Sequence, residues 1–215
     1  MGLFSYDNKF FQTLNQILDF VVLSLIWTVS SLPIITIGAS TTALYHTVDK
    51  VLRREEGKMW KEYWRVFRRD FKRATGLWLI CLLILTVVAV NCFLVFVFTW
   101  ESSSLQTLLQ IVVVFLTAVL LCWMQFWFPY LARFDDTVKQ ILRNTLAMMM
   151  ANTGVVLRLL GILMLVVFLE NILAQTVPVL TVAMPTAYIV AINRIIEKMF
   201  ARYIASWENS EKAEA

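Results

Sequence analysis

The stretch ATGLWLICLLILTVVAVNCFLVFVFTW, residues 74–100, contains no Asp, Glu, Lys or Arg. About 20 apolar residues in a helix cross the hydrocarbon core of a bilayer, which is about 30 Å thick. The run is apolar throughout and does not alternate with polar residues, as the strands of a membrane barrel do. It therefore predicts a membrane-spanning helix, which we place at about residues 75–99.

Uncharged runs recur along the rest of the chain, at residues 20–48, 102–132 and 171–193. The 215 residues are 60% hydrophobic and only 16% charged, which is typical of a membrane protein rather than a soluble domain. We predict an all-α polytopic membrane protein with one membrane domain over residues 1–205 and a short polar tail, 206–215. In addition to 75–99, the predicted spans are at about residues 18–37, 105–128, 155–175 and 178–198.

The Lys and Arg residues gather on one side of these spans. Of the 19, only Lys9 lies before the first span. Ten lie between the first and second spans, four around the connection between the third and fourth spans, and four in the C-terminal region. The positive-inside rule places that side in the cytoplasm. We therefore expect a multi-pass protein with the N-terminus outside and the C-terminus cytoplasmic. If residues 18–54 formed a re-entrant hairpin, the N-terminus would lie inside instead.

The first span is interrupted at SLPIITIGASTTALYH, residues 31–46. Pro33 removes a backbone donor, and Gly38 permits a tight turn. Ser40 or Thr41 would cap a new helix over about residues 39–54. Two interpretations stay open. The break is a packing kink whose hydroxyl groups join helices, or it lines a solute path as broken helices do in transporters.

The segment KMWKEYWRVFRRDFKRA, residues 58–74, is amphipathic at helical spacing. Its aromatic face holds Trp60, Tyr63, Trp64, Phe67 and Phe71, and its basic face holds Lys61, Arg65, Arg68, Arg69 and Lys72. This pattern predicts an interfacial helix that binds the anionic headgroups of the inner leaflet. Nucleic acid is not an expected partner, because membrane spans lie on both sides and the aromatic residues face away from the cations.

Few residues indicate a catalytic, cofactor or metal site. His46 is the one histidine, no nucleotide-binding or hydrolase motif occurs, and we expect neither a cofactor, a metal site nor an enzyme. A second cytoplasmic helix is predicted over residues 135–151. Ionisable residues inside a span are candidates for function, so Glu170 is paired with Ser40 as a candidate polar pathway.

Three stretches of the sequence are similar to a known protein family: LPIITIGASTTALYHTVDKVLRREEG (32–57), WRVFRRDFKRATGLW (64–78) and ILRNTLAMMMANT (141–153). They resemble the YesL family of small bacterial membrane proteins, a domain of unknown function, over about residues 1–205. The most specific pattern, P-x-x-T-x-G-x-x-x-x-A-L-Y, is carried by Pro33, Thr36, Gly38, Ala43, Leu44 and Tyr45. Arg143 and Asn144 form a second marker.

The resemblance implies a bacterial plasma membrane and a link to carbohydrates. YesL-like proteins are typically encoded in Gram-positive bacteria beside genes for plant-polysaccharide use, sugar ABC importers and two-component regulators. We therefore expect a non-enzymatic accessory component that associates with a sugar ABC permease or a sensor kinase. The alternative is a transporter or permease component that itself moves a small solute, and a homo-oligomer stays open.

Overall fold

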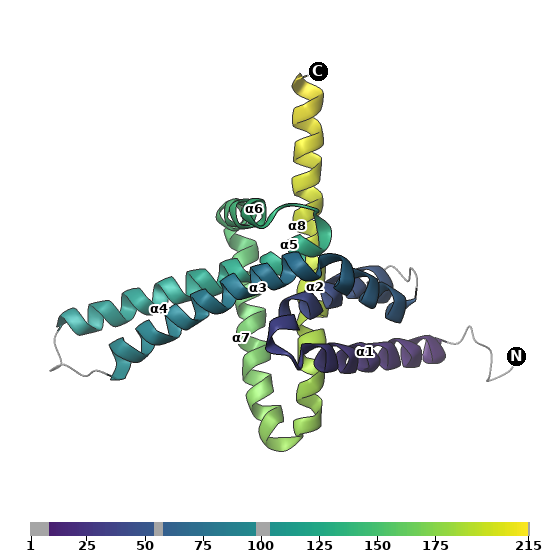
Figure 1. Ribbon diagram of the computed structural model, residues 1–215, viewed down its shortest axis with the longest axis horizontal. Helices are drawn as coiled ribbons and strands as arrows, with labels where there is room; N and C mark the ends of the chain where they lie inside the picture. The colour runs from purple at the N-terminus through teal and green to yellow at the C-terminus, as the bar shows by residue number, and fades with distance from the viewer. Residues whose placement is uncertain (1–8, 54–57, 98–103, 215) are drawn as a thin grey trace, which may run out of the picture.

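The computed structural model describes residues 9–53, 58–97 and 104–214 (Figure 1). That part of the chain is helical and contains no strand. The elements are α1 (Lys9–Ser31), η1 (Ile34–Thr36), α2 (Ile37–Thr47), the π-helical η2 (Val48–Arg53), α3 (Met59–Val97), α4 (Ser104–Met124), α5 (Trp127–Arg133), α6 (Val138–Ala151), α7 (Thr153–Thr176), η3 (Pro178–Ala183) and α8 (Met184–Glu214).

Four helical segments of the described chain are long and apolar enough to cross a membrane, which confirms the all-α membrane class. They are Met59–Val95, Thr107–Arg133, Thr153–Thr176 and Leu180–Ala205. The segment predicted as the first span, 18–37, yields only the shorter apolar helix Leu18–Ser31. Its apolar length of about 21 Å does not reach across a core of about 30 Å. The prediction of about five spans is therefore reduced to four candidates.

The predicted break after the first apolar segment is present, although α1 already ends at Ser31. The Thr36 hydroxyl donates to the carbonyl oxygens of Ser30 and Pro33, at 2.7 and 2.6 Å. Trp78 Nε1 donates to the carbonyl oxygen of Ile34 at 2.7 Å. These bonds satisfy carbonyl groups at the interruption, as broken backbone at membrane depth requires. The next helix, α2, begins two residues earlier than predicted.

One helix occupies the place of two predicted ones. The interfacial helix 58–74 and the span 75–99 were expected as separate elements, but α3 runs through both for 39 residues. At 1.5 Å per residue α3 is about 58 Å long, nearly twice the thickness of a bilayer core. Its first half cannot lie flat on a membrane that its second half crosses at right angles.

Other element boundaries differ by less. A turn after Met124 separates α4 from α5 and so divides the predicted span 105–128. Helix α6 begins at Val138 rather than near residue 135, because Thr137 is its N-cap and forms a capping box with Gln140. Helix α8 continues to Glu214, so the predicted polar tail is helical through residue 214.

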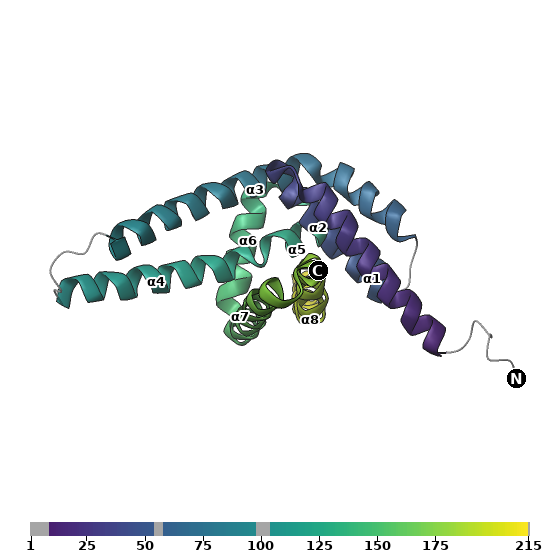
Figure 2. The ribbon, with the colours of Figure 1, turned by 90° about the horizontal axis from the view of Figure 1, so that it is seen from below.

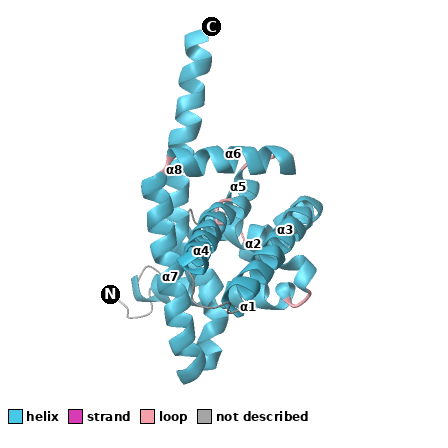
Figure 3. Ribbon diagram, turned by 90° about the vertical axis from the view of Figure 1, so that its left-hand side faces the viewer, coloured by secondary structure: helices cyan, strands magenta, loops and turns pink. Residues whose placement is uncertain are grey.

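The long helices form two hairpins that point in different directions (Figures 1 and 2). Helices α3 and α4 lie side by side in one, and α7 and α8 in the other, while α6 runs at a steep angle to α7 and α8 and contacts α7 (Figure 3). Large apolar side chains project outward from both hairpins, among them Leu83, Phe115 and Met164. The buried core gathers around α2 instead, and includes Leu23, Ala43, Leu44, Tyr45, Leu77, Trp127 and Phe200.

Candidate functional site

Gly38 lies where α2 and α3 approach each other most closely. A Cβ atom at this position would lie 2.6 Å from the carbonyl oxygen of Ala74 and 2.6 Å from Cβ of Trp78. Gly38 is buried within helix α2, so the tight turn predicted for it is wrong. The glycine is required because a side chain would hold the two helices apart.

The other residues of the family pattern mostly serve packing. Ala43, Leu44 and Tyr45 are buried in the core around α2, whereas Pro33 is exposed at the break. On α6, Asn144 Nδ2 donates to the hydroxyl oxygen of Tyr130 at 2.9 Å and to Asp136 Oδ2 at 3.3 Å. Its neighbour Arg143 points outward and is exposed.

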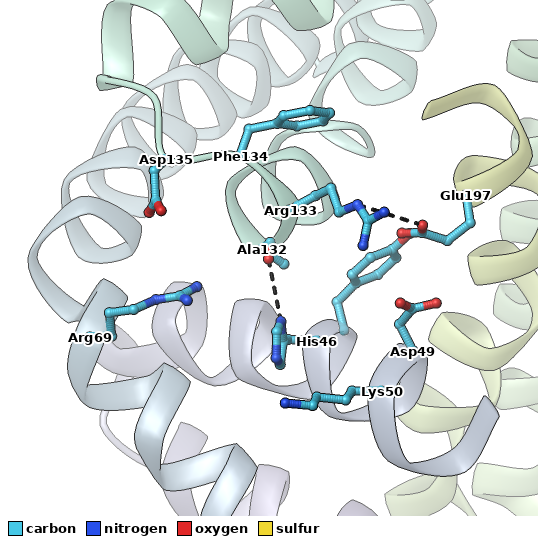
Figure 4. Close-up of a pocket in the computed structure, with 10 residues that line it drawn as sticks. His46, Asp49, Lys50, Arg69, Ala132, Arg133, Phe134, Asp135 and Glu197 are labelled. Carbon is cyan, nitrogen blue, oxygen red and sulfur yellow. Dashed lines mark hydrogen bonds and ion pairs between the residues drawn. The ribbon is translucent and has the colours of Figure 1, made fainter. Parts of the chain in front are cut away.

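A polar cavity of about 280 Å³ opens where α2, α3, α5 and α8 meet (Figure 4). Its charged residues are three cations and three carboxylates, and its remaining lining is mostly aromatic and backbone. The residues are Tyr45, His46, Asp49, Lys50, Arg69, Ala132, Arg133, Phe134, Asp135 and Glu197. Charges of both signs suit a polar ligand that itself carries both signs, and the cavity is the candidate functional site.

Tyr45 and Glu197 meet at the wall of the cavity. The Tyr45 hydroxyl donates to Glu197 Oε1 at 3.2 Å, and Arg133 Nε lies 4.0 Å from Glu197 Oε2. Burial, followed by the negative charge of Glu197, raises the pKa of Tyr45 well above its usual value. Tyr45 is therefore a neutral hydrogen-bond donor that holds the carboxylate in place.

His46 bridges α2 and α5. Its Nδ1 lies 3.4 Å from the carbonyl oxygen of Ala132, and its Nε2 lies 3.9 Å from Glu62 Oε2. Burial lowers the pKa of His46, and the positive charges of Arg69 and Lys50 act in the same direction. The ring is therefore neutral near pH 7. We assign its proton to Nδ1, because a carbonyl oxygen only accepts hydrogen bonds.

The lowered pKa of His46 predicts a loss of stability in acid. The unfolded chain takes up the proton near pH 6.5 while the folded chain resists it, so the free energy of unfolding falls as the pH drops through this value. Thermal unfolding in detergent at pH 7.5 and pH 5.5 measures the change. In the His46→Gln variant the change is expected to be smaller. An unaltered pH dependence in that variant would assign the acid sensitivity to the carboxylates instead.

Two acidic residues of α3 are buried in ion-pair networks. Glu62 Oε1 accepts from Lys50 Nζ at 3.3 Å, and Arg65 pairs with the same carboxylate. Asp70 is 1% exposed and accepts from Arg69 and Arg73, whose shortest N to O distances are 2.7 and 2.9 Å. Sequence reasoning did not identify either residue, because no local pattern distinguishes a buried carboxylate within this basic segment.

The aromatic face of residues 58–74 is directed mainly toward the protein. Tyr63 is buried, and its hydroxyl oxygen lies 2.5 Å from the hydroxyl oxygen of Ser30. Trp64, Phe67 and Phe71 are partly buried against the core, and Trp60 is 59% exposed. Arg65, Arg68 and Arg69 are exposed on the other face. Trp60, Lys61, Trp64, Arg65 and Arg68 line an open groove. Contact of this groove with anionic lipid stays a prediction.

The candidate polar pathway is not assembled. The hydroxyl oxygen of Ser40 is enclosed and has no hydrogen-bond partner, whereas Glu170 is exposed on α7. A cavity of about 250 Å³ beside Thr41 of α2 is lined mainly by apolar residues, together with Thr41, Gln125 and Tyr188. No group of three His, Cys, Asp or Glu side chains within the described ranges is placed to hold a metal ion.

Comparison with known proteins adds a family similarity. Residues 20–92 match the family of proteins of unknown function DUF624. The matched region covers the apolar part of α1, all of α2 and most of α3, and so includes the close contact at Gly38. No curated protein and no solved structure matches the chain. The DUF624 similarity therefore covers the packing centre of the molecule and assigns no activity.

Proposed function

We propose that this chain is a non-enzymatic accessory protein of the bacterial plasma membrane, and that its charged cavity binds a cytoplasmic segment of a sugar ABC permease or a sensor kinase. The charged cavity at the C-terminal end of α2 is the observation that supports this function. The link to carbohydrate uptake comes from the resemblance to the YesL family, carried by Pro33, Thr36, Gly38 and the Ala43–Tyr45 segment.

The charges of the cavity favour a protein segment over a polyanion. Lys50, Arg69 and Arg133 are balanced by Asp49, Asp135 and Glu197, so the lining carries no net charge with His46 neutral. A partner loop with both acidic and basic residues would complement the charges of this lining. Asp135 is 79% exposed at the rim, and Arg73, which pairs with it, holds its pKa below the usual range. It is therefore an accessible carboxylate at physiological pH.

Four spans also change the proposed topology. An even number of spans places both termini on the same side, so a cytoplasmic C-terminus implies a cytoplasmic N-terminus. Lys9 then joins the other 18 basic residues on the inner side, in line with the positive-inside rule. This arrangement replaces the outside N-terminus expected from five spans.

We expect a fluorescent reporter to fold when fused to either terminus, and a periplasm-dependent phosphatase to stay inactive at both. The two reporters placed in the link between α7 and η3, which is predicted to face outward, are the control and should give the opposite result. An active phosphatase at the N-terminus alone would restore the topology with five spans.

Site-specific photo-crosslinking tests the partner. A photoreactive residue in place of Asp135, in cells grown on plant polysaccharide, should capture a sugar permease or sensor kinase subunit. The same residue in place of Leu165, which is 56% exposed on α7, is the matched control. The charge reversal Arg133→Glu should reduce the capture at 135. Equal capture of the same subunit from 135 and 165 would contradict a role for the cavity.

The transporter alternative is supported by two enclosed hydroxyls at the break, Ser31 Oγ and Ser40 Oγ, which have no hydrogen-bond partner. Such groups are suited to line a path that opens in another conformation. Purified protein in liposomes would distinguish the two functions. Uptake of a sugar by this chain alone, lost in Ser40→Ala, would replace the accessory function with transport.

A further inference from the structure

A second pocket, of about 140 Å³, lies between the start of α7 and the middle of α8. Half of its lining residues are cations, and none is acidic. The lining consists of Asn152, Val155, Arg158, Arg194, Ile195, Lys198, Met199 and Arg202. This composition is unlike that of the charged cavity beside Tyr45, in which the two signs balance.

The four cations are gathered without counter-charge. Arg194, Lys198 and Arg202 recur every fourth residue on α8 and so share one face, toward which α7 contributes Arg158. All four are exposed, and none forms an ion pair with another residue of the described chain. Like charges four residues apart destabilise a helix. A bound anion would offset this repulsion.

The backbone at the pocket also favours an anion. Asn152 is the N-cap residue of α7, but its side-chain amide donates to the carbonyl oxygen of Met148 at 3.0 Å and does not cap the helix. The amide of Val155, the first-turn residue of α7 that lines the pocket, donates to the carbonyl oxygen of Asn152 at 2.9 Å. The helix end therefore adds its partial positive charge to that of the four cations, and the side chains supply the direct contacts to an anion.

The remaining lining residues are apolar. Val155, Ile195 and Met199 stand beside the cations, and α7 and α8 continue from here as candidate membrane spans. Basic pockets between membrane helices on the cytoplasmic side bind the headgroups of acidic phospholipids. A lipid places its phosphate among the cations and its acyl chains along the apolar wall, whereas free phosphate uses only the first of these contacts.

We propose that this pocket is a specific site for the phosphate group of an anionic phospholipid of the inner leaflet. The site is separate from the Trp60–Arg68 groove on α3 and does not depend on the partner bound by the charged cavity. It fixes the bases of α7 and α8 at the membrane surface. The lipid takes the place of the missing counter-charge.

Titration with a short-chain phosphatidylglycerol, read by native mass spectrometry of the intact detergent-solubilised chain, tests the site. The triple variant Arg158→Gln, Arg194→Gln and Arg202→Gln should bind the first lipid on the order of 100-fold more weakly, since each cation contributes about fivefold. The double site variant Arg158→Gln and Arg194→Gln should weaken this binding about 25-fold. The matched control, Lys139→Gln and Arg143→Gln, removes the same charge from exposed positions outside the pocket and outside the basic face of α3. Its affinity should change by less than about threefold, because surface charges act weakly at a distance.

Three results would overturn the proposal. Equal weakening in the double site variant and in its matched control would show general attraction to a basic surface. Inorganic phosphate that binds the wild-type chain as tightly as the lipid, and is lost in the site variant, would assign the pocket to free phosphate. Phosphatidylcholine that binds as tightly would remove the need for a negative charge. Should the site variant fail to give a monodisperse protein, Arg158→Gln alone should still weaken binding about fivefold.

Discussion

The Gly38→Val variant is expected to lose about 3 kcal/mol or more of folding free energy, or to fail to assemble. The new Cβ would overlap the carbonyl oxygen of Ala74 and Cβ of Trp78, both at 2.6 Å. Neither atom is the end of a flexible side chain, so α2 and α3 must separate. This separation disturbs the core around α2, and thermal unfolding in detergent, followed by tryptophan fluorescence, measures the loss.

The matched control is Gly76→Ala on α3, because a Cβ built at Gly76 has no atom within 4 Å apart from its chain neighbours and the backbone of its own helix. Alanine favours helix over glycine by about 0.5–1 kcal/mol, so this variant should be unchanged or slightly more stable. Gly38→Ala, by contrast, already introduces the clashing atom and should be destabilised by about 1–3 kcal/mol. Equal effects of the two alanine substitutions would contradict the close approach of α2 and α3 at Gly38.

Gly38 also illustrates what the sequence could and could not predict. The motif identified it as a special position, but the absence of a side chain serves both tight turns and close helix contacts. The choice between these depends on α3, which lies 36 residues further along the chain at Ala74. The membrane class, by contrast, followed from local runs of apolar residues. Such a run did not by itself predict the number of spans, because the run at residues 20–48 is interrupted by η1 and yields only the short apolar helix Leu18–Ser31.

The charged cavity was largely beyond sequence reasoning for the same reason. Tyr45 and Glu197 are 152 residues apart, and no local pattern pairs them. Asp70 was not singled out in the sequence, because burial of one residue on a basic helix face is decided by the packing of other elements. The signal available was the acidic residue itself, which stands between Arg69 and Arg73 in an otherwise basic segment.

The buried position of Asp70 predicts the second large effect. Asp70→Asn should lower the free energy of unfolding by about 2–4 kcal/mol, because hydrogen bonds to charged groups contribute about 1.5–3 kcal/mol each. The carboxylate accepts from Arg69 Nε at 3.1 Å, from Arg69 Nη2 at 2.7 Å and from Arg73 Nη2 at 2.9 Å. The neutral amide keeps the shape of the side chain but loses the charge that strengthens these bonds.

Asp135 supplies the internal control, because it accepts from the same Arg73 Nη2 at 2.9 Å but is 79% exposed. Exposed ion pairs contribute about 0–1 kcal/mol, so Asp135→Asn should lie in that range. The two variants remove the same charge from the same arginine and differ in burial and in the additional bonds from Arg69. Similar losses in both would mean that Asp70 is solvated in the folded protein. A loss of folding free energy confined to Asp70→Asn would show that this buried carboxylate holds the ion-pair network of α3 together, beside the cavity proposed to bind the partner.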